Sequence, residues 1–388
     1  MSTQLSMATL ALLLLLAFYV RVQAGFFDIR KYGATLNGDI TMALQNAWKD
    51  ACVSMTPSKI VVPSGKYKLR QIEFRGPCQA PIEIRVNGII IAPKNPFPLN
   101  GEDQWVRFGY LNFLTLSGKG TFHGRGKMSW KCKTDKNCNK LAMNFGFGFV
   151  NNSMIRDITS KDSKYFHVNV FGCKNITFTN FKVIAPAYSP NTDGIHIGKS
   201  TQVMISNSKI GTGDDCISLG DGSREVTILN VTCGPGHGIS VGSLGRYANE
   251  DSVENLTVRN CTLKNTNNGI RIKTWPGTPV TSLVSGFHFE DIIMVNVSNP
   301  VIIDQEYCPW NQCNKQSPSK VKISKVTFKN IRGTSATQEG VSLVCSSGVP
   351  CETVELSDID LTFNGTNASA KCKNVKPKSG RNAPICAA

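Results

Sequence analysis

The sequence predicts an all-β protein that folds as a single-domain parallel β-helix, which is a solenoid of short stacked strands. Six segments carry the prediction, because each has a usually small residue followed by alternating strand-forming residues. They are GIHI at 194, CISL at 216, GISV at 238, GIRI at 269, PVII at 300 and GVSL at 340, with spacings of 22, 22, 31, 31 and 40 residues. Such a repeat indicates coils that stack on their neighbours and share one core.

A second strand-like motif follows each of these segments and carries a recurrent Asn or Asp. The recurrent residues are Asn180, Asn207, Asn230, Asn260, Asp291, Asn330 and Asp358. Side chains of this kind form hydrogen-bonded ladders when strands stack. No linker or low-complexity stretch divides residues 25–388, so we expect one β-helix domain over this range.

The first 24 residues have the features of a targeting segment. Residues 8–20 form an apolar run, and Val22 and Ala24 complete a small-residue cleavage pattern. The run is too short to span a bilayer, so we predict a signal peptide over residues 1–24 and a secreted protein that is not bound to a membrane.

A helix is predicted at the start of the remaining chain. In ITMALQNAWKDAC, residues Leu44, Ala47, Trp48 and Ala51 recur at helical spacing behind Thr41, a possible N-cap. We expect this helix to cover the open end of the first coil, where unpaired backbone would otherwise invite aggregation.

Cysteines and sequons agree with export. All 14 cysteines follow residue 24, and an even number in a secreted chain favours disulfides over metal ligands. Close spacing suggests the pairs Cys132–Cys138, Cys308–Cys313, Cys345–Cys351 and Cys372–Cys386, although spacing alone does not fix the connectivity. Cys52, just beyond the predicted helix, could tie the helix to Cys78. Eight Asn-x-Ser/Thr sequons, which predict a glycoprotein, begin at Asn151, Asn175, Asn230, Asn255, Asn260, Asn296, Asn364 and Asn367.

The formal net charge of the whole chain is +16 at pH 7. This charge suits a polyanionic partner, which could be nucleic acid, an anionic membrane or an acidic polysaccharide. Export disfavours nucleic acid, and we expect no membrane partner. The alternative is a basic surface that only keeps the protein soluble.

Three aspartates are predicted to meet a histidine where the coils stack. The residues immediately before the small residue form a column of Asp193, Asp215, His237 and Asn268, and Asp214 adjoins it. Stacked strands lie about 4.8 Å apart, so these carboxyls cannot all ionise freely and at least one pKa should be raised. Glycoside hydrolysis needs one protonated and one ionised carboxyl. A polar ladder that caps turns is the alternative, but it does not explain three aspartates at successive coils beside a histidine.

Adjacent carboxyls also raise a problem of direction. Alternation from Ile217 and Leu219 places Asp214 on the outward phase and Asp215 on the inward phase. Because Asp215 should act on the same outward side as Asp214, we expect the chain to turn at this point. The same phase predicts that the small column of Gly194, Cys216, Gly238 and Gly269 faces outward as a shallow floor.

Two cations follow one coil later. Arg271 and Lys273 are two residues apart and therefore share one strand face, where they could grip an acidic sugar. Ordinary solubilising charge is the alternative. Tyr307 could stack on a sugar or be a plain surface tyrosine. We assign no functional role to the remaining histidines, His123, His167, His196 and His288.

Four motifs resemble one enzyme family. NTDG at 191–194, GDD at 213–215, GHG at 236–238 and RIK at 271–273 occur in the order and spacing of the polygalacturonases, glycoside hydrolase family 28, and look most like the plant pollen enzymes that act as exopolygalacturonases. The resemblance implies a right-handed β-helix that hydrolyses α-1,4 bonds of polygalacturonate with inversion. Asp214 then resembles the general acid, Asp193 and Asp215 the pair that activates water, and His237 the histidine that supports the acid. The groups that resemble substrate-binding residues are Asn191, Arg271, Lys273 and Tyr307.

The resemblance implies no cofactor and no metal, and we expect a monomer. Whole-chain similarity favours exo action, while endo action stays open. A pectate lyase, which eliminates and generally needs calcium, and a non-catalytic wall-binding solenoid are weaker alternatives. The intact cluster of Asp193, Asp214, Asp215 and His237 argues against the non-catalytic alternative.

Overall fold

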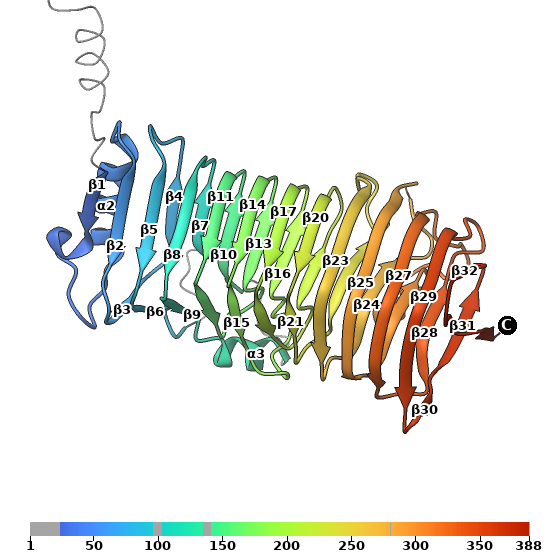
Figure 1. Ribbon diagram of the computed structural model, residues 1–388. Coiled ribbons are helices and arrows are strands. Elements are labelled where there is room, and N and C mark those ends of the chain that lie inside the picture. Colours follow the sequence, from blue (N-terminus) through green and yellow to red (C-terminus); the bar gives the residue numbers. More distant parts are fainter. Residues whose placement is uncertain (1–23, 96–102, 135–140, 280, 388) are drawn as a thin grey trace, which may run out of the picture.

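The computed structural model describes residues 24–95, 103–134, 141–279 and 281–387 and has the shape of an elongated solenoid (Figure 1). Stacked strands follow one another along its axis in chain order, from the blue end to the red end. The predicted signal peptide lies, apart from Ala24, outside the described residues. In the part of the chain that the structure describes, no helix has the length and apolar character needed to cross a bilayer.

Among the described residues, 21 strands form the first sheet. They are β1 (Gly25–Asp28), β2 (Ser58–Val62), β3 (Lys66–Lys68), β5 (Ile82–Val86), β6 (Ile89–Ile91), β8 (Leu114–Gly118), β9 (Thr121–His123), β11 (Asn151–Arg156), β12 (Thr159–Lys161), β14 (Lys174–Thr179), β15 (Lys182–Ile184), β17 (Thr201–Ser206), β18 (Lys209–Gly211), β20 (Arg224–Leu229), β21 (Thr232–Cys233), β23 (Val253–Lys264), β25 (Leu283–Val297), β27 (Lys322–Ser335), β29 (Glu352–Phe363), β30 (Thr366–Asn367) and β32 (Lys378–Ser379). Strands β29 and β30 pair antiparallel, whereas the other described pairings are parallel.

The second sheet has 12 described strands, all paired in parallel. They are β4 (Ile72–Arg75), β7 (Gln104–Gly109), β10 (Met143–Gly148), β13 (Val168–Phe171), β16 (Ile195–Gly198), β19 (Ile217–Leu219), β22 (Ile239–Leu244), β24 (Asn268–Thr274), β26 (Asn299–Asp304), β28 (Glu339–Val344), β31 (Ser369–Lys373) and β33 (Cys386–Ala387). The described helices are α2 (Thr41–Val53), α3 (Lys127–Thr134) and the short 3-10 helices η1 (Ile29–Tyr32) and η2 (Pro309–Asn311).

The six predicted repeats are strands of the second sheet. Their first apolar residues stand in one line across the coils, since Ile195 pairs with Ile217, Ile217 with Ile239 and Ile239 with Ile270. The line continues through Val301 and Val341. All of these side chains are buried in one core. The predicted parallel β-helix is therefore confirmed.

The predicted Asn and Asp ladder is also confirmed. Each of its seven residues has a positive φ, from 49° at Asn180 to 58° at Asn260, at the bend of its coil. Asn and Asp tolerate this left-handed conformation better than most residues. Asn230 Nδ2 donates to Asn207 Oδ1 at 2.7 Å, and Asn330 Nδ2 donates to Asp291 Oδ1 at 2.7 Å.

Helix α2 lies at the N-terminal end of the solenoid, beside β1 and β2 (Figure 1). Leu44, Ala47, Trp48 and Ala51 are buried in it, as the helical spacing predicted. The predicted N-cap is wrong, because the helix already begins at Thr41 and its backbone N–H donates to the Asp39 carboxylate at 2.9 Å.

Four predicted disulfides are confirmed, namely Cys52–Cys78, Cys308–Cys313, Cys345–Cys351 and Cys372–Cys386. The Cys132–Cys138 prediction involves Cys138, which lies outside the described residues. A further disulfide joins Cys216 to Cys233 inside the core. Cys173 and Cys261 are buried free thiols, so the even number of cysteines does not mean that every one is paired.

Candidate active site

The predicted site residues gather around five consecutive strands of the second sheet. Asn191 and Asp193 precede β16, Asp214 and Asp215 precede β19, and His237 precedes β22. Arg271 and Lys273 lie in β24, and Tyr307 follows β26. Because these strands stack in register, residues up to 116 positions apart in the sequence lie within five consecutive coils.

Asp214 is the most exposed of the three aspartates. Its Oδ2 accepts a hydrogen bond from Asn191 Nδ2 at 3.2 Å, and its Oδ1 lies 3.1 Å from His237 Nδ1. The backbone N–H of Asp215 also donates to Oδ1, at 2.8 Å. The Asp214 side chain is 19% exposed, compared with 4% for Asp215, so Asp214 is the carboxyl that a ligand on this face can touch most easily.

Asp215 is held between cations of the following coils. Its Oδ1 accepts hydrogen bonds from Ser240 Oγ at 2.8 Å and Arg271 Nη2 at 3.0 Å, and its Oδ2 from Lys273 Nζ at 3.1 Å. Burial opposes ionisation of this carboxyl, but the charges of Lys273 and Arg271 outweigh it and hold the pKa of Asp215 below its usual value. Asp215 is therefore ionised at neutral pH.

Asp193 has the opposite environment. Its Oδ2 accepts a hydrogen bond from Ser218 Oγ at 3.0 Å, whereas its buried Oδ1 has no hydrogen-bond partner among the described residues. Burial, reinforced by the nearby charges of Asp214 and Asp215, raises the pKa of Asp193 well above its usual value. The prediction that at least one carboxyl has a raised pKa is confirmed, and this carboxyl is Asp193.

The expected turn at Asp215 is confirmed. Cys216 and Ile217 are both fully buried, so the in-and-out alternation breaks between them and Asp215 reaches the outer face. The predicted glycine floor is wrong, because Cys216 points into the core, where it bonds to Cys233. A Cβ at Gly194 would lie 2.4 Å from Cγ2 of the core residue Ile210, so this column needs small residues for inward packing.

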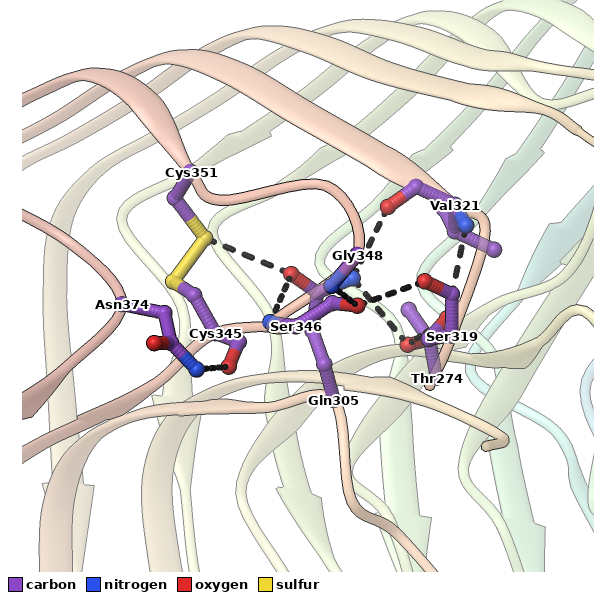
Figure 2. Close-up of a disulfide and its surroundings, with 9 residues drawn as sticks. All are labelled: Thr274, Gln305, Ser319, Val321, Cys345, Ser346, Gly348, Cys351 and Asn374. Atoms are coloured by element: carbon purple, nitrogen blue, oxygen red, sulfur yellow. Dashed lines mark hydrogen bonds between the residues drawn. A yellow bond between two sulfur atoms is a disulfide. The ribbon is translucent and has the colours of Figure 1, made fainter. Parts of the chain in front are cut away.

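A buried glutamine braces the end of the site that carries the cations (Figure 2). Gln305 Nε2 donates to the Val321 carbonyl at 2.8 Å and to Thr274 Oγ1 at 3.4 Å. Its Oε1 accepts from the Ser346 N–H at 3.1 Å and lies 3.4 Å from Cys351 Sγ of the disulfide. Thr274 follows Lys273, and Gln305 lies two residues before Tyr307, so one side chain holds the ends of β24 and β26 together.

The family model for glycosyl hydrolases family 28 matches residues 52–384. The chain belongs to this family. A polygalacturonase of Medicago sativa is 57% identical over 390 residues, which cover 99% of this chain and 93% of the relative. An exopolygalacturonase of Oenothera organensis is 51% identical over 356 residues, which cover 90% of this chain and 98% of the relative.

Solved structures agree in fold. An endo-xylogalacturonan hydrolase from Aspergillus tubingensis has a TM-score of 0.78 and 24% identity, over 91% of this chain and 98% of that one. An exopolygalacturonase from Thermotoga maritima has a TM-score of 0.73 and 16% identity, over 94% of each chain. These similarities show the β-helix alone. The predicted membership of the polygalacturonase family, and with it the class of glycoside hydrolase, is confirmed by the sequence matches.

The family 28 hydrolase also contains three residues beside the aspartates that the sequence analysis did not assign, His196, Ser218 and Ser240. His196, Ser218, Ser240 and Arg271 form one outward column. His196 Nδ1 lies 2.8 Å from Ser218 Oγ, which donates to Asp193. Burial lowers the pKa of His196 to about 4, so the ring is neutral. The signal was present in the repeats, because the third letters of GIHI, CISL, GISV and GIRI are these four residues.

Asp214, Asp215 and His237 each offer one possible metal-ligand atom, and these atoms lie within 4.8 Å of one another. Both oxygens of Asp215 already accept hydrogen bonds from Arg271 or Lys273. A divalent cation here would have to approach these two cations and compete with them for the same carboxylate. These three residues therefore fit a metal poorly.

Proposed function

We propose that this family 28 hydrolase is a secreted, monomeric exopolygalacturonase that hydrolyses α-1,4-galacturonosyl bonds of polygalacturonate with inversion of configuration. The observation that carries the proposal is the unequal trio of aspartates. Asp215 is held ionised by Lys273 and Arg271, Asp193 has a raised pKa, and Asp214 is the most exposed. Inverting hydrolysis needs an ionised carboxylate that takes a proton from water, which Asp215 offers, and a second carboxyl within reach of the substrate, which Asp214 offers.

Asp214 is assigned the role of general acid. Its carboxyl faces His237 Nδ1 and Asn191 Nδ2, which fix its orientation. In the proposed step Asp214 gives its proton to the glycosidic oxygen as the bond from that oxygen to the anomeric carbon breaks. The sugar that leaves then carries a neutral hydroxyl, so no alkoxide has to form.

Asp215 is assigned the role of general base. A water molecule held between Asp215 and Asp193 loses a proton to the ionised Asp215 as its oxygen attacks the anomeric carbon from the face opposite the leaving sugar. The pKa of Asp193 is raised, and in its protonated form this carboxyl can donate a hydrogen bond to the water. Attack from the opposite face inverts the configuration at that carbon.

Arg271 and Lys273 are assigned to the carboxylate of a galacturonate residue. Both side chains are largely buried beside Asp215 and still border the outer face of the second sheet. A guanidinium and an ammonium both bind carboxylates, and the net charge of +16 favours encounter with a polyanion. Polygalacturonate as the substrate is further supported by the names of the plant relatives, and exo action by those of Oenothera organensis and Platanus acerifolia.

Product analysis over time on polygalacturonate tests the proposal. We expect monomeric galacturonate from the first time point, unchanged by a chelator, and a newly formed anomer of inverted configuration by NMR. A ladder of oligomers would show endo action instead. Unsaturated products that disappear with chelator would indicate a lyase, and binding without new reducing ends would indicate a non-catalytic solenoid.

A further inference from the structure

A row of cations and aromatic rings continues outward from Lys273. Lys273 Nζ lies 5.4 Å from the centroid of the Tyr307 ring. The Tyr307 ring meets Trp275 edge to face with centroids 5.9 Å apart, and Arg246 Cζ lies 4.9 Å from the centroid of Trp275. We call these four residues the rim row. It connects the cation that binds Asp215 to an exposed guanidinium on the loop after β22.

The loop that carries Arg246 is held in one conformation by a carboxylate. The backbone N–H groups of Gly245, Arg246 and Tyr247 all donate to Glu250, the latter two at 2.9 Å. Three donors on one carboxylate fix the backbone and leave the Arg246 side chain to pack over Trp275 and beside Tyr247. The Glu250 carboxylate therefore binds the backbone of the loop and not the Arg246 guanidinium.

The Arg246 guanidinium forms no ion pair among the described residues. Two other exposed arginines are paired, Arg224 with Glu254 and Arg259 with Asp291. A guanidinium packed on an aromatic face keeps its in-plane N–H groups available for a planar acceptor such as a carboxylate. The rim row therefore holds the Arg246 guanidinium in place with its N–H donors available to a ligand.

We propose that Arg246, backed by Trp275 and Tyr307, forms a second carboxylate-binding subsite for the galacturonate residue next to the one bound by Arg271 and Lys273. This inference rests on the proposed function, because it assigns a position to a further acidic sugar of the same substrate. The subsite selects for a free carboxylate. A methyl ester has no charge to offer the guanidinium, and the sugar ring would retain only its contacts with the aromatic side chains.

Arg246→Gln tests the subsite. With polygalacturonate at low salt, we expect KM to rise about five- to tenfold and kcat to stay within about twofold, since the lost contact is one partly exposed charged hydrogen-bonded pair. Binding of the variant to the methyl-esterified oligomer should match that of the wild type. Arg259→Gln is the matched control, because it removes an exposed arginine from the first sheet and should alter neither binding nor turnover.

Glu250→Gln should raise KM less than Arg246→Gln does and should also affect the free acid more than the ester. The reason is that this change loosens the loop and leaves the guanidinium in place. An unchanged KM in Arg246→Gln, or an equal loss with acid and ester, would overturn the subsite and leave Arg246 a purely structural residue. Calorimetric binding of trigalacturonate and its methyl ester keeps the test separate from the proposed function. If the wild type binds trigalacturonate without hydrolysing it, the proposed hydrolytic activity is wrong. Equal affinities of the wild type and Arg246→Gln for trigalacturonate would refute the subsite independently of that activity.

Discussion

Two columns of Asn and Asp side chains cross the same coils of this solenoid, and they behave differently. In the ladder at the bends of the first sheet, side-chain amides donate to side-chain oxygens of a neighbouring coil, as Asn230 donates to Asn207 and Asn330 to Asp291. In the cluster before the strands of the second sheet, Asp193 and Asp215 are buried and face hydroxyls and cations. The same residue type therefore serves as a hydrogen-bonding bend residue where the next coil offers an amide. Its pKa is shifted where it is buried beside charged groups.

Replacing one carboxyl by an amide in each column should separate these behaviours most clearly. Asp214→Asn removes the proposed acid, so release of reducing ends from polygalacturonate should fall at least about 10²- to 10⁴-fold, the usual contribution of general acid catalysis. Folding and substrate binding should be largely retained. The matched ladder variant Asp291→Asn should keep wild-type activity. Near-normal turnover by Asp214→Asn would refute the role given to Asp214.

The second variant concerns the counterion of the buried cations. Asp215→Asn leaves Lys273 and Arg271 buried without their carboxylate, so the free energy of unfolding at pH 7 should fall by about 3–5 kcal/mol. Urea denaturation measures the change. Asp291→Asn, which loses only an exposed pair with Arg259, should cost about 0–1 kcal/mol. Equal losses in the two variants would contradict the comparison.

In the third variant the change in unfolding free energy at pH 7 should have the opposite sign. Asp193 has a folded-state pKa above that of an unfolded aspartate, so it favours folding fully only below about pH 3.9 and loses this contribution as the pH rises through its raised pKa. Asparagine does not titrate. The difference in unfolding free energy between Asp193→Asn and the wild type should therefore favour the variant more at pH 7 than near pH 3.5. The variant should also lose activity. Urea denaturation at several pH values checks this, and a difference that does not vary with pH would count against it.

Much of this contrast could be predicted from the sequence, because both columns follow from the repeat. GIHI, CISL, GISV and GIRI fixed the stacking of β16, β19, β22 and β24, and their spacing brought Asp193, Asp215 and His237 together. What a period cannot supply is the direction of a residue at a bend. Alternation predicts that Cys216 faces outward, whereas its side chain points into the core. The ionisation of each aspartate depends on which donors surround it in three dimensions.

The smallest predicted effect concerns the ladder itself. Asn207 has a φ of +50°, and its Oδ1 accepts from Asn230, so Asn207→Ala should lose about 1–2 kcal/mol of unfolding free energy through strain in the left-handed region and one unsatisfied amide. Asn207→Gly removes the same hydrogen bond but adopts this φ without strain, so it should be the more stable of the two. Both should keep wild-type kcat on polygalacturonate, because the ladder is a structural column. A ladder variant that unfolds no more easily than the wild type but loses turnover would show that the two columns are coupled across the core, and the separation drawn between them would then fail.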